Sequence, residues 1–471
     1  GLVNRPWARR LLLRAFISDG EKELQHNVLM TVPYGEVTYR ETTAGATLRY
    51  ELALGNGVTL DAIGGYTYAR ASFLDVGRCV YDWLGRCLRE RRTPGEIQSS
   101  PRDEVIWDNS GFGRVNLGVQ IHPQHALQLS VSPTFVTRTG DDRNSTNTEG
   151  RDPLTAERDL FTLVSGVEYK LDVLDDRLEN ILFVKDYAQL ARTEEPLPGR
   201  PDQFHRRDRD THSFGVGDGL RYRFFDWLYA KASYEWATRL PRTDELFGDG
   251  ILIVPNLDLL PERSHNANLG LTLDARPAAA GAFRLDVNGF FRQLDQLIVP
   301  IGSERLITYQ NVQSARSVGV EAAAGWTSPG EHVRLDGNIT YQDFRNTSRK
   351  GLFARFEGDR IPNRPWLFAN GSIRVQRRSV AAPRDELALT WNTRYVHAFF
   401  RTWESAGSPG SKQPGPSQLV HSLALTYLVR GQKLTVSSTA ELQNLTDERV
   451  FDFIGVQRPG RAFFFKTTLE M

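Results

Sequence analysis

The feature that most constrains the fold of this chain is a regular alternation of apolar and polar residues, sustained over runs of about ten residues. The clearest example lies near the C-terminus, within 418–471. Its first run places apolar or aromatic residues at every second position: Leu419, His421, Leu423, Leu425, Tyr427 and Val429. Because successive side chains of a β-strand point to opposite sides, this pattern predicts strands whose two faces meet different media.

The same unit recurs about 18 times, and its connections alternate between tight turns and long polar segments. One short connection, Gly55-Asn56-Gly57, contains the Asn-Gly signal of a β-hairpin. The long segments lie at Asp75–Asp103, Thr139–Arg158, Glu195–Asp210, Pro241–Glu262, Thr347–Arg360, Ser405–Pro416 and Glu448–Arg461. Short periplasmic turns and long external loops are typical of outer-membrane barrels. The sequence therefore predicts an all-β, transmembrane antiparallel β-barrel.

Composition is consistent with this prediction. The 471 residues are 40% hydrophobic and 24% charged, with a mean hydropathy of −0.41. The chain has no apolar stretch near the roughly 18 residues of a membrane helix, but a barrel strand needs none, because every second residue faces a polar interior. A soluble sandwich array or propeller would need shorter strands or a fixed repeat. The net charge of +1 gives no reason to expect a nucleic-acid partner.

The two cysteines, Cys79 and Cys87, are close together in the first long polar segment. We expect them to form a small disulfide, since this segment would face an oxidising exterior. Two unrelated thiols are the alternative. A metal site is disfavoured, because no histidine or second cysteine pair accompanies them.

Four ordered motifs in the second half of the chain carry a resemblance. The first spans Glu245-Leu246-Phe247-Gly248 and 255–262, followed by Asn268-Leu269-Gly270. The second reads from Asn311 to Glu321, the third is Ile361-Pro362-Asn363-Arg364-Pro365, and the fourth pairs 443–448 with 455–461. The residues that carry the match are Leu246, Phe247, Gly248, Pro255, Asn256, Pro261, Glu262, Asn311, Gly319, Val320, Glu321, Asn444, Leu445, Pro459, Gly460 and Arg461. Together they resemble the TonB-dependent outer-membrane receptors of the siderophore-receptor type, although Leu257 and Leu260 replace the family's usual Pro and Lys.

The resemblance implies a barrel of about 22 strands with a plugged interior. Residues 1–471 would form this barrel, whereas the N-terminal plug, the TonB box and the first strands would lie outside them. The implied function is TonB-dependent uptake of a scarce ligand, a ferric siderophore, across the outer membrane of a Gram-negative bacterium. Its partners would be outer-membrane lipid, a plug on an N-terminal segment or separate chain, and the TonB system. The alternative is a plugless barrel that acts as a scaffold or conduit in a larger envelope complex.

The sequence carries no enzyme motif of the G-x-S-x-G or H-E-x-x-H type, so we expect no catalytic residues, metal or cofactor. His205 and His212 lie in an arginine-rich segment and fit a solvated loop better than a metal site. A catalytic barrel is the more distant alternative. Charged residues at inward positions, among them Arg284, Asp286 and Arg334, are expected to line a polar interior.

If the chain is a receptor, external loops should hold the ligand. Aromatic rings and arginines suit an anionic, aromatic iron chelate through stacking and charge. The candidates are Tyr81, Trp83, Phe247, Tyr309, Arg355, Phe356, Trp403 and Arg458. The alternative is that most of them pack the loops or belong to the aromatic girdle at the membrane interface.

Overall fold

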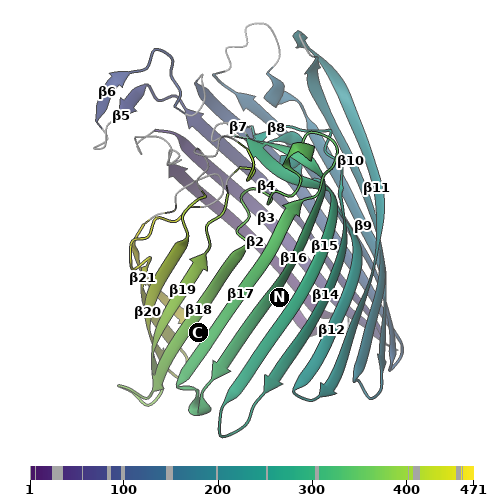
Figure 1. Cartoon of the computed structure of the whole chain (residues 1–471), viewed down its shortest axis with the longest axis vertical. Coiled ribbons are helices and arrows are strands. Elements are labelled where there is room, and N and C mark those ends of the chain that lie inside the picture. The colour runs from purple at the N-terminus through teal and green to yellow at the C-terminus, as the bar shows by residue number, and fades with distance from the viewer. Residues whose placement is uncertain are drawn as a thin grey trace. The chain divides into compact units, whose positions relative to one another are not determined.

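The computed structural model describes residues 2–5, 7–23, 36–55, 57–81, 86–96, 101–144, 152–197, 200–250, 253–302, 307–400, 402–406, 414–451, 458 and 460–470. Within these ranges the chain is almost entirely β-structure, as the alternation predicted (Figure 1). Among the described residues, no helix combines the length and the apolar character that crossing a membrane would require.

The strands vary widely in length, and 18 of those that the structure describes have nine residues or more. The first half contains β1 (Leu2–Arg5), β2 (Ala8–Glu23), β3 (Thr38–Gly55), β4 (Val58–Asp75), β5 (Cys79–Tyr81), β6 (Cys87–Glu90), β7 (Arg102–His122), β8 (His125–Asp142), β9 (Arg158–Val173), β10 (Leu178–Leu197), β11 (Arg200–Phe225) and β12 (Leu228–Arg239). The second half contains β13 (Ile253–Val254), β14 (Glu262–Ala275), β15 (Ala282–Gly302), β16 (Ile307–Thr327), β17 (Val333–Asn346), β18 (Leu367–Arg378), β19 (Asp385–Val396), β20 (Gln418–Arg430), β21 (Thr435–Gln443) and β22 (Ala462–Glu470). The helical elements are α1 (Thr243–Phe247) and the 3₁₀ turns η1 (Pro153–Thr155), η2 (Pro329–Glu331) and η3 (Ala354–Phe356).

Strand pairing joins twenty of these strands into one sheet, and β5 and β6 form a separate two-stranded sheet. The chain divides into two compact units. Unit 1 comprises Gly1–Gly219, Glu235–His265 and Leu294–Val312, and unit 2 comprises Leu220–Tyr234, Asn266–Gln293 and Gln313–Met471. In unit 1, antiparallel pairing runs β1–β2–β3–β4–β7–β8–β9–β10. In unit 2 it runs from β16 through β17, β18, β19, β20 and β21 to β22, several of which lie side by side in Figure 1.

The register turns the alternation into a continuous apolar band. In unit 2, one row of directly paired residues crosses seven strands: Trp326, Leu335, Ile373, Trp391, Leu423, Leu442 and Phe463. In unit 1 a similar row contains Leu52, Leu60, Leu117, Leu129, Val167 and Val184. Many of these side chains are exposed, for example Ile373 at 49% and Trp391 at 50%. Exposed apolar rows of this length suit contact with lipid.

The neighbouring rows face the other way and are polar. One position away from the apolar row of unit 2 lie Gly325, Asp336, Ser372, Asn392 and Ser422. The matching row of unit 1 is Glu51, Asp61, Asn116, Ser130, Gly166 and Lys185. A shift of one residue in any pairing would exchange the two faces, so the pattern fixes the register.

The tight turn between β3 and β4 follows the sequence signal. Gly55 pairs with Val58, and both Gly55 and Gly57 have positive φ, +84° and +76°. Residues with a side chain rarely adopt such angles, so glycine is favoured at both places.

One expectation about a loop was wrong. Residues 195–210, expected as an external loop, belong mainly to the long strands β10 and β11, of 20 and 26 residues. This part of the two strands is rich in arginine and aspartate and has no apolar face. The alternation of apolar and polar residues that predicts a strand is therefore missing here. The 241–262 segment, expected as a long loop, connects β12 to β14 and contains the five-residue helix α1.

Candidate functional site

The 241–262 segment of unit 1 folds back onto the sheet, and α1 is its centre. The helix begins after Arg242, whose backbone N–H donates to Glu245 Oε2 (2.8 Å), and ends at Gly248, whose N–H donates to the Asp244 carbonyl (3.0 Å). Gly248 has φ +70° and ψ −179°, a conformation essentially limited to glycine. This places Leu246 and Phe247 on the buried side of the helix.

These two side chains form the middle of an apolar cluster. Leu246 and Phe247 are 1% and 3% exposed. The cluster also contains Leu160, Ala191, Leu257, Leu259 and Ile298, with Val136 and Tyr309 packed against it. Val136 on β8, Leu160 on β9 and Ala191 on β10 lie on the face of the sheet that carries the polar row Ser130, Gly166 and Lys185. Burying each large apolar side chain contributes about 1.5–3 kcal/mol, so the segment is fixed to this wall.

A buried arginine on β8 also links the 241–262 segment to the sheet. Arg138 on β8 is 8% exposed. Its guanidinium binds both carboxylate oxygens of Asp108 on β7 (2.7 and 2.6 Å), donates to Asp244 of α1 (3.0 Å) and donates to the Gly248 carbonyl. One cation therefore links two strands to both ends of the helix.

Residues of the family-type motifs also hold the 241–262 segment in place through hydrogen bonds. Asn256 Nδ2 donates to the Tyr309 carbonyl (2.7 Å), and Asn311 Nδ2 donates to the carbonyls of Leu260 (2.9 Å) and Gln296 (2.8 Å). Glu262 Oε1 accepts the backbone N–H of Ile298 (2.7 Å). These asparagines and this glutamate satisfy backbone groups that the irregular chain would otherwise leave unpaired.

The motif residues from Gly319 onward lie in unit 2. A side chain at Gly319 would place its Cβ 2.3 Å from the Tyr341 carbonyl oxygen, so only glycine fits there. Its neighbours Val320 and Glu321 are exposed. Near the C-terminus, Asn444 exchanges two hydrogen bonds of 2.8 Å with the backbone of Glu448. The N–H of Leu445, the residue after Asn444, donates to the His421 carbonyl (2.7 Å). In the last part of the motif, the N–H of Arg461 donates to Asp447 Oδ1 (2.8 Å).

At Gly460, a Cβ would approach Asp447 Oδ1 to 2.6 Å. Pro459 and its part of the motif lie outside the described residues.

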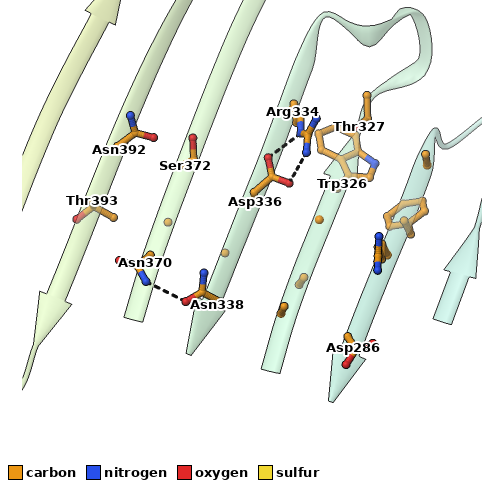
Figure 2. A pocket seen from close by; sticks show the side chains of 18 of the residues that line it. Asp286, Trp326, Thr327, Arg334, Asp336, Asn338, Asn370, Ser372, Asn392 and Thr393 are labelled. Carbon is orange, nitrogen blue, oxygen red and sulfur yellow. Dashed lines mark hydrogen bonds and ion pairs between the residues drawn. The ribbon is translucent and has the colours of Figure 1, made fainter. Parts of the chain in front are cut away.

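The second candidate region is a polar recess of about 970 Å³ in unit 2, lined by β14 to β20 (Figure 2). Arg334 forms a two-point pair with Asp336 (2.7 and 3.1 Å), and Asn370 donates to Asn338 (2.9 Å). The expected inward charges Arg284, Asp286, Arg334 and Asp336 all line it. The side chains that line the recess are mainly amides, hydroxyls and charged groups, so it offers hydrogen bonding and charge.

The predicted ligand residues fall into two separate groups. Phe247 and Tyr309 belong to the apolar cluster of unit 1. In unit 2, Phe356 of η3 stacks on Trp403 at 5.0 Å between ring centroids, and both side chains are 7% exposed. Arg355 remains exposed and lies 4.6 Å above the Phe356 ring.

Arg458 is exposed. Trp83 and the side chain of Tyr81 lie outside the described residues. Of the candidates that the structure describes, the arginines therefore offer the more accessible surfaces, and Phe247, Phe356 and Trp403 contribute mainly to packing.

A disulfide joins Cys79 and Cys87, whose Cα atoms are 5.3 Å apart, which is the predicted pairing. Among the described residues, no group of three or more His, Cys, Asp or Glu side chains could hold a metal ion. His212 instead pairs with Asp186, with 2.7 Å between Nε2 and Oδ1.

Sequence reasoning missed the charged pair at the outer end of β7 and β8. Glu104 lies directly opposite Asp142, and Arg102 contacts both, at 3.2 and 2.9 Å. β7 has 21 residues, about twice the 9–11 that cross a membrane, so its third residue lies outside the membrane. Burial raises the pKa of Glu104 to about 8; Arg102 lowers the pKa and Asp142 raises it further. A protonated carboxyl is also consistent with Oε2, which is buried with no hydrogen-bond partner among the described residues.

A sheet with long antiparallel strands, an apolar band on one face and polar rows on the other defines the class of transmembrane β-barrel proteins. The family model for the β-barrel of TonB-dependent receptor-like proteins matches residues 31–445. The chain therefore belongs to the TonB-dependent receptor β-barrel family, as the motifs implied. Members of this family are outer-membrane receptors and transporters that act with the TonB system.

Solved structures agree on the fold. The chain is similar to the ferric preacinetobactin receptor BauA from Acinetobacter baumannii, with a TM-score of 0.69, 14% identity and coverage of 98% of this chain and 70% of that one. The ferric yersiniabactin uptake receptor FyuA from Yersinia pestis gives a TM-score of 0.67, 13% identity and coverage of 97% and 67%. The copper transporter OprC gives a TM-score of 0.68 and 14% identity, with coverage of 92% of this chain and 68% of that one. No match was found among curated protein sequences.

Proposed function

We propose that this chain is the barrel of an outer-membrane receptor that takes up a ferric siderophore in a TonB-dependent manner. The family membership of residues 31–445 carries the proposal. Two similar structures bear the names of ferric siderophore receptors, and a third that of a copper transporter. The names of all three similar proteins thus refer to a metal-containing ligand.

The external loops supply candidate ligand contacts. Arg355 is exposed above the Phe356 ring, and the ring is held by its stack on Trp403. An arginine supported in this way can meet an anionic chelate with charge and with its planar face. We propose Arg355 and Arg458, both of unit 2, as direct contacts.

We further propose that a plug domain and the first barrel strands lie outside residues 1–471, and that the polar recess of unit 2 contacts the plug. The paired Arg334 and Asp336 and the linked Asn338 and Asn370 present donors and acceptors on one surface. Such a surface suits the hydrated, polar exterior of a globular domain.

The test uses the full reading frame, expressed in a Gram-negative host that lacks its own siderophore receptors. Uptake of ⁵⁵Fe bound to catecholate, hydroxamate and phenolate siderophores, and of ⁶⁴Cu, is measured with and without TonB. Uptake of one iron chelate only in cells with TonB supports the proposal. A large, constant conductance of the purified protein in planar bilayers, without TonB-dependent uptake, would favour the conduit alternative instead.

A further inference from the structure

The disulfide-closed hairpin of β5 and β6 has one strongly basic face. Cys79 pairs with Glu90 and Val80 with Arg89, while the N–H of Arg91 donates to the Arg78 carbonyl (2.5 Å). Residues directly opposite in an antiparallel pair share a face. Arg78, Val80, Arg89 and Arg91 therefore lie on one side of the hairpin, and Cys79 and Glu90 on the other.

The base of this hairpin is firmly attached to unit 1. Asp75 and Glu96 are 0% and 2% exposed. Asp75 accepts the N–H of Glu96 (2.5 Å), Glu96 accepts the N–H of Glu36 (3.1 Å), and the N–H of Gly95 donates to the Gly77 carbonyl (2.9 Å). The basic face is therefore held in a fixed place beyond the ends of β4 and β7 (Figure 1).

The charges on this face are not neutralised within the described part of the chain. Arg78 and Arg89 are exposed and form no ion pair with any described residue. Arg91 donates one Nη1 hydrogen bond to the Gly95 carbonyl (3.0 Å), and its Nε has no partner among the described residues. Like charges on one face of a strand pair are destabilising unless an anion lies between them. In a chain with a net charge of only +1, this concentration of positive charge calls for an anionic partner.

The distance of the hairpin from the tight β3–β4 turn indicates which anion it can bind. β4 has 18 residues between the tight turn and the hairpin. At about 3.3 Å per residue and a tilt of about 40°, it rises roughly 45 Å, whereas the apolar band of an outer-membrane barrel is about 25 Å tall. The hairpin base thus lies above the hydrocarbon layer, at or beyond the polar layer of the outer leaflet. Leu88, the unpaired residue of the β6 bulge, is 65% exposed beside the arginines, and exposed apolar and basic residues together favour a lipid interface.

We propose that Arg78, Arg89 and Arg91 bind phosphate groups of outer-leaflet glycolipid, so that the hairpin anchors the receptor to lipopolysaccharide. This inference rests on the proposed outer-membrane placement but not on any particular siderophore. Guanidinium groups bind phosphate through paired hydrogen bonds. The disulfide and the strand pairing hold the arginines on one face of the hairpin.

The test measures binding of the detergent-purified full chain to vesicles that contain bis-phosphorylated lipid A, and to vesicles of the dephosphorylated glycolipid. R78Q/R89Q should weaken binding to phosphorylated lipid about tenfold to thirtyfold, since each basic residue near an anionic surface contributes about 1 kcal/mol. R377Q/R384Q is the matched control, because both arginines are exposed in unit 2 near the β18–β19 turn; it should bind as the unmodified protein does. C79S/C87S should also bind more weakly, and heat-modifiable migration in gels verifies that each variant is folded.

Equal binding of R78Q/R89Q and the unmodified protein would overturn the inference, as would equal binding to both glycolipids. Loss of ferric siderophore uptake in R78Q/R89Q with lipid binding intact would also overturn it, by assigning the face to the transported ligand. If the unmodified protein shows no uptake of any chelate, the proposed function fails, while the vesicle result still decides the lipid inference.

Discussion

Arg138 on β8 joins the 241–262 segment of unit 1 to the sheet. It joins Asp108, Asp244 and the Gly248 carbonyl, and it is almost completely buried. Nothing in the local sequence marks it, because its partners lie 30 and 106 positions away. A buried cation with partners from two elements holds those elements in one arrangement.

Arg138→Met should loosen the 241–262 segment. Removing one partner from a buried ion pair costs about 3–5 kcal/mol, and the lower end applies because Asp244 is half exposed. Limited proteolysis of the folded protein should show faster cleavage within 241–262. Arg143→Met is the control, since Arg143 is exposed and 4.0 Å from Asp103, and it should change little. Equal cleavage rates in the two variants would contradict the assigned role of Arg138.

Glu104 should make stability depend on pH. Its pKa in the folded protein, about 8, lies above the ordinary 4.5, so the folded state holds a proton that the unfolded state releases. The stabilising effect is complete below about pH 4.5 and is lost as pH rises through 8. Glu104→Gln, a neutral replacement, should therefore melt at a higher temperature than the unmodified protein at pH 9 and at the same temperature at pH 4. A difference of the opposite sign at pH 9 would show that folding lowers the pKa of Glu104 instead of raising it.

At the scale of elements, α1 and Gly248 show how local chemistry and tertiary contacts combine. Glu245 pairs with the Arg242 N–H and with Arg239 (3.0 Å), so the short helix is stabilised from its own ends. Gly248 then reverses the chain, and Pro255 and Ile253 close against it. The apolar cluster supplies the rest of the stabilisation.

Gly248→Ala should disrupt this element. The new Cβ would lie 2.3 Å from the Ile253 carbonyl oxygen, at a φ of +70°, and backbone strain of this kind costs about 1–3 kcal/mol before any clash is counted. The expected result is a lower melting temperature together with faster cleavage in 241–262. Gly20→Ala provides the comparison, because a Cβ at Gly20 meets nothing within 4 Å and should be tolerated. If both variants behave alike, the tight contact at Gly248 is not restrictive.

At the scale of the whole molecule, membrane insertion depends on which face of the sheet each residue occupies. Ile373 and Ser372 are neighbours on β18, yet one belongs to the apolar row and the other to the polar row. The apolar rows and the polar rows continue from strand to strand in each unit. This is the arrangement that the TonB-dependent receptor barrel family requires.

Ile373→Arg should therefore impair folding into bilayers, whereas Ser372→Arg should not. An arginine on the lipid face near the membrane midplane costs about 2–4 kcal/mol, and one on the polar face costs close to zero. Folding into lipid vesicles at increasing urea, followed by heat-modifiable migration, measures the difference. Similar losses for both variants would mean that the assignment of faces on β18 is wrong.

The sequence by itself determined the β-architecture, the tight β3–β4 turn and the family, and it favoured the cysteine pairing that the structure shows. These properties follow from period-2 alternation, from glycine at positive φ and from short motifs, all of which act over neighbouring residues. Only the tertiary structure showed that Phe247, Phe356 and Trp403 are buried, that residues 195–210 extend two strands, and that Arg138 and Glu104 are buried. Burial and charge pairing depend on strands that are distant in sequence, such as β8 and α1, and no local pattern records which residues those contacts will enclose.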